Sequence, residues 1–146
     1  YAPVVVEHEM TKQMLMKERS IQASFELMKK CNVAVICVGE LTEQSTMCTR
    51  GHITKEDIRV LREAGFVGDL AMNPIRADGS WDSCPLTERS LNASMECLKH
   101  IKSVILVACG DSKIDAIHAA MRTGGIDILI TDETTARKVL NKSTEE

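Results

Sequence analysis

The last third of the chain alternates between apolar strands and amphipathic helices, and this alternation limits the fold more than any other feature. The apolar run at 104–108 leads into a helix at 114–121, and a second run at 126–130 leads into a helix that Asp132 can cap. Short links between alternating strands and helices are typical of a parallel sheet with right-handed crossovers. This region therefore predicts an α/β fold.

Earlier apolar runs extend this prediction to a Rossmann-like parallel sheet with helices on both faces. The predicted strands lie near residues 4–6, 33–38, 67–72, 104–108 and 126–130. The run at 33–38 is apolar at every position, as expected of a parallel strand that helices cover on each side.

Helix and turn signals lie between these strands. Apolar residues at helical spacing between Met10 and Met28 predict helix, with a break near Ser20, and residues 91–100 predict another helix. Thr54 starts a further helix with a capping-box-like pattern that Asp57 completes. The Asp78-Gly79 pair, which follows a strand, predicts a hairpin turn.

Composition favours a single domain over residues 1–146, with 44% hydrophobic and 27% charged residues. A formal net charge of -3 gives no basic surface for nucleic acid, and no apolar run approaches the roughly 20 residues that cross a membrane. The six cysteines form no CxxC pair, so we expect no zinc site, reduced thiols and a cytoplasmic location. The chain starts without Met inside a predicted strand, and we expect the natural protein to continue upstream.

Candidate ligand residues follow the predicted strands, because ligands of parallel sheets bind at the carboxyl ends of strands. Three loops qualify: residues 39–45 starting at Gly39, the Gly68-Asp69 loop, and residues 109–113. In the third, Gly110 allows close approach of the backbone, and the following amides lie at the positive end of a helix.

The charged residues of these loops have two interpretations each. Lys113 is suited to a phosphate, whereas Asp111 competes with an anion for the amides around Ser112; alternatively, this is a capped helix with a solvated lysine. The Asp69 carboxylate can accept hydrogen bonds from sugar hydroxyls, or it is satisfied by turn amides. Arg50 and Arg89 are phosphate partners or surface residues. GxGxxG, P-loop and GxSxG motifs are all missing from the sequence, so no dinucleotide, nucleotide or serine-hydrolase site is expected.

The same stretches resemble the effector-binding domain of the SorC family of sugar-metabolism repressors. The resemblance runs in family order through VICVG (35–39), ITKED (53–57), GFVGDL (65–70), ADG (77–79), VILVACGDSK (104–113), AIHAA (116–120) and LITDETTA (129–136). It implies a fold similar to the group of sugar-phosphate isomerases, glucosamine-phosphate deaminases and CoA-transferases.

This resemblance also implies a function. It predicts a homo-oligomer that binds a sugar phosphate or a free sugar, without cofactor, metal or catalysis, and thereby changes its affinity for DNA. Lys113 then matches the lysine of a glycine-rich phosphate turn, and Asp69 matches the acidic residue that faces the sugar. Two features depart from the family: Cys109 replaces the first glycine of the turn, and the chain contains neither a helix-turn-helix nor the upstream part of the phosphate cradle.

Two other functions remain open. A sugar-phosphate isomerase or deaminase of the same fold needs a general base, for which Asp69 is a candidate, but the sequence indicates no second acid or base. The remaining alternative is a structural or oligomerisation module without a ligand.

Overall fold

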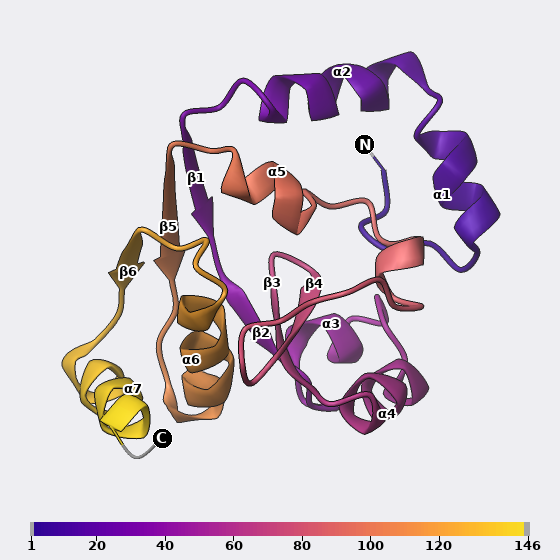
Figure 1. Cartoon of the computed structure of the whole chain (residues 1–146). Coiled ribbons are helices and arrows are strands. Elements are labelled where there is room, and N and C mark those ends of the chain that lie inside the picture. The colour runs from indigo at the N-terminus through magenta and orange to yellow at the C-terminus, as the bar shows by residue number, and fades with distance from the viewer. Residues whose placement is uncertain (1, 145–146) are drawn as a thin grey trace.

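The computed structural model describes residues 2–144 and contains two three-stranded sheets (Figure 1). The first sheet is parallel, with the strand order β1-β5-β6. Its strands are β1 (Val33–Ile36), β5 (Ser103–Val107) and β6 (Ile128–Ile130). The α/β core predicted from the strand and helix alternation is therefore confirmed.

The second sheet is antiparallel and continues directly from the first. Its strands, in the order β2-β3-β4, are β2 (Val38–Glu40), β3 (Phe66–Leu70) and β4 (Asn73–Arg76). Only Cys37 separates β1 from β2, and its carbonyl accepts a hydrogen bond of 3.2 Å from the Ala71 amide at the tip of the next hairpin. The apolar run predicted as one strand therefore contributes to both sheets.

Two predicted strands do not belong to the parallel sheet. The segment at 67–72 is wrong as a parallel strand, because the chain reverses at Ala71-Met72 and β3 pairs with β4 in a hairpin. The segment at 4–6 forms only an isolated antiparallel bridge between Val5 and Ser90, since its backbone pairs with a loop instead of a strand. Asp78-Gly79 forms a turn after β4, in which the Gly79 amide donates to the Arg76 carbonyl at 2.9 Å.

Helices begin and end near most of the predicted signals. Their bounds are α1 (Glu9–Leu15), α2 (Arg19–Met28), α3 (Thr46–Thr49), α4 (Lys55–Glu63), α5 (Met95–Lys99), α6 (Ile114–Arg122) and α7 (Glu133–Thr144), with 3-10 turns η1 (Thr87–Arg89) and η2 (Asp111–Lys113). The break predicted near Ser20 is present but lies slightly earlier, at residues 16–18 between α1 and α2. The helix expected at 91–100 is shorter, because Ser94 accepts a hydrogen bond of 3.1 Å from the Cys97 amide and starts α5 there. Within residues 2–144, no helix has the length and hydropathy needed to cross a membrane.

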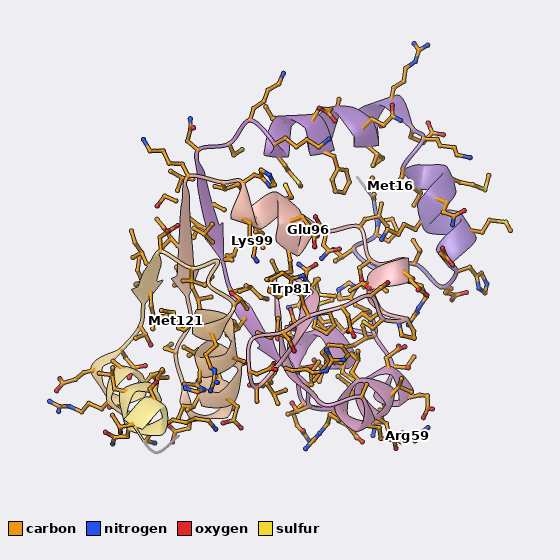
Figure 2. The ribbon with its side chains drawn as sticks, in the orientation of Figure 1. Met16, Arg59, Trp81, Glu96, Lys99 and Met121 are labelled. Atoms are coloured by element: carbon orange, nitrogen blue, oxygen red, sulfur yellow. The ribbon has the colours of Figure 1, made fainter. Side chains whose placement is uncertain are left out.

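Helices α5, α6 and α7 contribute to the core on one face of the parallel sheet. Leu98, Ile117 and Val139, one from each helix, pack with Leu106 of β5 in this core. At its edge, the Lys99 ammonium lies 4.2 Å from the centroid of the Trp81 ring (Figure 2). A second cluster packs Ile58 and other residues under α4. The cavity described below lies between these two clusters.

The other face of the parallel sheet is exposed among the described residues. We call it the exposed sheet face; its residues are Val33 (53% exposed), Val35 (68%), Val107 (42%), Ile128 (46%) and Ile130 (52%). The strand register places these residues on one side of the sheet. The sequence predicted burial on both faces, but here only one face is buried.

The capping box predicted at α4 is present. The Thr54 hydroxyl accepts a hydrogen bond of 3.0 Å from the Asp57 amide, and the Asp57 carboxylate accepts one of 2.8 Å from the Thr54 amide.

We expect Thr54→Ala to reduce the free energy of unfolding by about 1 kcal/mol, and the thermal midpoint by about 2–4 °C, in circular dichroism. Thr134→Ala, an exposed substitution inside α7, is the control, and an equal loss in both variants would contradict the role of the cap.

Candidate functional site

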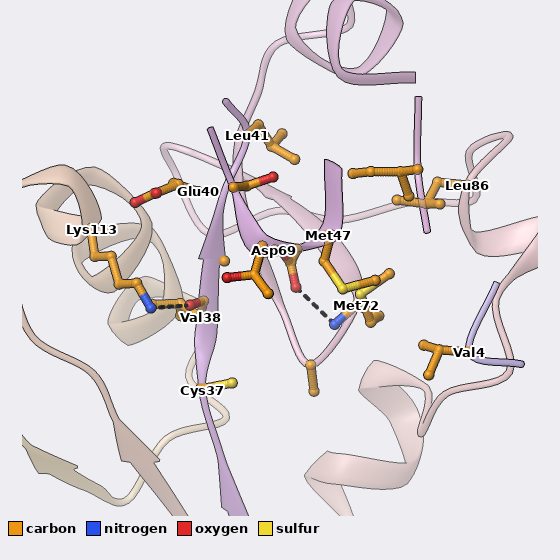
Figure 3. Close-up of a pocket in the computed structure, with 15 residues that line it drawn as sticks. Val4, Cys37, Val38, Glu40, Leu41, Met47, Asp69, Met72, Leu86 and Lys113 are labelled. Atoms are coloured by element: carbon orange, nitrogen blue, oxygen red, sulfur yellow. Dashed lines mark hydrogen bonds between the residues drawn. The ribbon is translucent and has the colours of Figure 1, made fainter. Parts of the chain in front are cut away.

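A cavity of about 500 Å³ lies where the antiparallel sheet meets the start of α6 (Figure 3). Gly39, Asp69 and Lys113 line it, so the fold brings together three of the predicted site residues. Its apolar wall consists of Val4, Leu41, Met47, Ile53, Met72 and Leu86, with further lining from β2 and α3. The arrangement is that of a small-molecule pocket, with a largely apolar lining and few polar groups.

Asp69 fits into the wall of this cavity because the residue that pairs with it, Gly39, has no side chain. Gly39 pairs with Asp69 across β2 and β3, and a Cβ atom on Gly39 would lie 2.0 Å from Asp69 Oδ2. Asp69 itself is 9% exposed. The glycine therefore makes room for the buried carboxylate.

The other carboxylate oxygen of Asp69 holds the hairpin turn that forms one wall. Asp69 Oδ1 accepts a hydrogen bond of 2.8 Å from the Met72 amide (Figure 3). Ala71 and Met72 have φ angles of 50° and 67°, which cost non-glycine residues roughly 1–2 kcal/mol each. The Asn73 side chain also donates to the Ala71 carbonyl, at 3.2 Å. The turn-amide interpretation of Asp69 thus holds for Oδ1, while Oδ2 makes no hydrogen bond with any residue in 2–144 and packs against Gly39.

Lys113 extends from the start of α6 to the edge of β2 and lines the cavity there. Its Nζ atom donates to the Val38 carbonyl at 3.3 Å (Figure 3). Burial raises the pKa of Asp69 above its ordinary value, while the Met72 amide and the Lys113 ammonium oppose that rise. The two predicted polar residues are therefore coupled electrostatically.

Apart from Lys113, the predicted phosphate turn lies outside the residues that line this cavity. The Gly110 amide donates to Thr135 Oγ1 at 2.9 Å, and the Asp111 carboxylate pairs with Lys138 at 2.7 Å. Ser112 is exposed. Much of this turn is thus engaged with α7, which Asp132 caps as predicted by accepting from the Thr135 amide at 2.9 Å.

Sequence reasoning missed one charged residue of the cavity, Glu40. It is half-buried, and its Oε2 atom is buried without a hydrogen-bond partner among the described residues. Its only sequence signal is a carboxylate directly after Gly39 at the end of an apolar run.

The two arginines considered as phosphate partners do not line the cavity. Arg89 pairs with Asp57 and is engaged in the protein itself. Arg50 is exposed and is not among the residues that line the cavity.

Residues 2–144 contain no cluster of three or more histidine, cysteine or acidic side chains that could hold a metal ion. The polar groups that remain for a ligand are carboxylates, one ammonium and the hydroxyls of Ser45 and Thr46. Such a set can hold a polyhydroxy compound by hydrogen bonds.

We expect Asp69→Asn to stabilise the protein at neutral pH. Because folding raises the pKa of Asp69, the folded state holds this proton more tightly, and the contribution of Asp69 to stability falls as pH rises above about 4. Asparagine keeps an oxygen acceptor for the Met72 amide and does not ionise. Denaturant unfolding should therefore show an advantage of the variant at pH 7 that shrinks at pH 4.

Asp78→Asn is the matched control for this effect. The Ser80 hydroxyl and amide hold the pKa of the exposed Asp78 below its usual value, so its substitution should give no gain at pH 7. A less stable Asp69→Asn variant at pH 7 would show that burial does not dominate at this carboxylate.

A protein-family model described as "Putative sugar-binding domain" matches residues 1–141 of the chain. The chain is 30% identical over 139 residues to the deoxyribonucleoside regulator of Bacillus subtilis. This match covers 95% of this chain and 44% of the regulator. It therefore spans less than half the length of this curated relative.

Solved structures of regulators share the fold. A DeoR family transcriptional regulator from Listeria monocytogenes matches with a TM-score of 0.89 and 32% identity, over 95% of this chain and 56% of that one. The full-length sorbitol operon regulator SorC from Klebsiella pneumoniae matches with a TM-score of 0.86 over 96% of this chain and 46% of its own, at 19% identity, which shows the fold alone. The resemblance inferred from sequence is confirmed at the level of family and fold.

Proposed function

Because this chain belongs to the sugar-binding domain family, we propose that it is the effector-binding module of a bacterial transcriptional regulator of carbohydrate metabolism. The effector is a sugar or a sugar phosphate that binds in the cavity. The observation that carries this proposal is the convergence of Asp69 from β3 and Lys113 from the start of α6 on one largely apolar pocket. The module senses its ligand in the cytoplasm without cofactor or chemical change.

The proposal assigns a role to each predicted site residue. Asp69 accepts hydrogen bonds from sugar hydroxyls through Oδ2, and Gly39 provides the space for this carboxylate. Lys113 donates to the effector. If the effector carries a phosphate, the amides around Gly110, Asp111 and Ser112 are its nearest helix-start donors.

DNA binding belongs to a part of the protein outside these 146 residues, since this acidic chain has no basic stripe. The relatives that are about twice as long support this division of labour.

An effector panel separates this function from its alternatives. Sugars, polyols and their phosphates are added to the protein at its natural length while the thermal midpoint and the concentration of each compound are measured. A rise in midpoint without turnover supports the sensor. Turnover would identify an isomerase or deaminase, and no response to any compound would favour a structural module.

Lys113→Ala should weaken effector binding by roughly ten- to a hundredfold in calorimetric titration, because a charge-assisted hydrogen bond contributes about 1.5–3 kcal/mol. Lys113→Arg should restore only part of the affinity, since the planar guanidinium has a different shape. A steeper loss for a phosphorylated ligand would assign Lys113 to the phosphate, and equal losses would assign it to the sugar. Lys102→Ala, an exposed substitution before β5, is the control. Unchanged affinity in Lys113→Ala would remove this residue from the site.

The proposal includes a homo-oligomer in which other parts of the protein cover the exposed sheet face. Chains that expose such an apolar sheet face associate with one another, because burial of apolar surface is favourable. In analytical ultracentrifugation we expect the 146-residue chain to self-associate and the double variant Val35→Lys, Ile130→Lys to do so less. Met10→Lys on α1, where Met10 is 71% exposed, is the control. A compact monomer with cooperative unfolding would contradict this expectation.

A further inference from the structure

Glu40 is one of the residues that line the cavity, and part of its carboxylate is unsatisfied. Its side chain lies on the opposite face of β2 from Asp69, because the neighbouring Gly39 is the residue that pairs with Asp69 (Figure 3). Alternate residues of a strand face the same side, so Glu40 follows Val38, which is 1% exposed, toward the start of α6. Figure 3 shows the Glu40 side chain and Lys113 on the same side of β2. Most buried polar atoms in folded proteins have a partner, so the unpartnered Oε2 of Glu40 is an exception that requires an explanation.

The charges around the cavity set a limit on what it can hold. Among the described residues that line it, Glu40 and Asp69 are acidic and Lys113 is the only cation. A phosphate ester adds a further charge of about −1.5 to −2 at neutral pH. One ammonium, already bonded to the Val38 carbonyl, faces two carboxylates, so the lining has no positive excess to offset a phosphate.

The helix-start donors are separated from this lining. The Gly110 amide donates to Thr135, the Asp111 carboxylate pairs with Lys138, and neither residue lines the cavity. By contrast, hydroxyl groups suit the cavity, because an ionised carboxylate is an acceptor only and forms strong hydrogen bonds with O–H donors. The side chains of Leu41, Met47 and Met72 provide apolar surface for the C–H groups of such a compound.

We propose that Glu40 determines specificity by accepting a hydrogen bond from an effector hydroxyl, so that the cavity binds an uncharged polyol or free sugar in preference to its phosphate. This inference rests on the proposed function, since it specifies the effector of the same cavity. Asp69 and Glu40 then accept from different hydroxyls, one on each face of β2, and Lys113, on the same side as Glu40, donates to a hydroxyl or ring oxygen.

The test is calorimetric titration of the protein at its natural length with pairs of compounds that differ only in the phosphate. The probes are erythritol, ribitol, sorbitol, ribose and deoxyribose, each with its terminal monophosphate. We expect the wild-type protein to bind at least one uncharged compound about tenfold or more tightly than its phosphate. In Glu40→Gln, affinity for the uncharged compound should fall about tenfold, and affinity for the phosphate should rise about tenfold.

Glu43→Gln is the matched control, because Glu43 lies in the following loop, is about half-exposed and pairs with Lys55 at 2.6 Å outside the cavity. It removes the same charge and should leave the ratio of affinities unchanged. Glu40→Gln should also keep or raise the thermal midpoint, since it removes a buried charged oxygen that has no partner.

Four outcomes overturn the inference. Tighter binding of a phosphate by the wild-type protein, or an unchanged ratio in Glu40→Gln, contradicts the role of Glu40 while leaving the sugar-sensing function intact. An equal change in Glu43→Gln would attribute the effect to overall charge. Absence of binding across all pairs would instead reject the proposed function, and the inference with it.

Discussion

The close packing of the Asp69 carboxylate against β2 is the contact on which the cavity depends. It requires a residue without a side chain at position 39, because any Cβ there would overlap with the carboxylate. With Asp69 in place, one of its oxygens holds the hairpin turn of Ala71 and Met72, and the other remains free. A single buried side chain thus shapes the wall and supplies a polar group, at the cost of a charge in a poorly solvated position.

The sequence predicted the elements whose stability is local and failed where distant contacts decide the conformation. The capped α4 and the alternating strands and helices after residue 103 follow from spacing and end residues. The hairpin turn does not, because neither Ala71 nor Met72 favours a left-handed backbone. Its conformation is imposed by hydrogen bonds from Asn73 and from Asn92, which lies about 20 residues further along the chain. The Asp78-Gly79 pair, which gave the strongest turn signal, forms the turn after β4 and not the hairpin turn between β3 and β4.

Part of the candidate site was also predictable from the sequence. Asp69 and Lys113 follow strands, where a general rule for parallel sheets places ligand groups, and both line the cavity. Glu40 gave no such signal, because a single carboxylate after an apolar run becomes a cavity residue only once β2 pairs with β3. For a related reason, the sequence wrongly predicted that helices bury the exposed sheet face. The apolar composition of a strand shows that both of its faces can be buried. It does not show which other element, if any, packs on each face.

Three contacts tie α7 to the start of α6, which also carries Lys113. Thr135 bonds to the Gly110 amide, Lys138 pairs with Asp111, and Lys142 pairs with Asp115 at 2.6 Å. These contacts are spread from Thr135 to Lys142 along a helix about 18 Å long, and they couple α7 to the segment that carries Lys113. A shift of the Lys113 segment would therefore strain its contacts with α7. Two of the three contacts are solvent-exposed ion pairs that added salt screens, so the stiffness of this connection decreases with ionic strength.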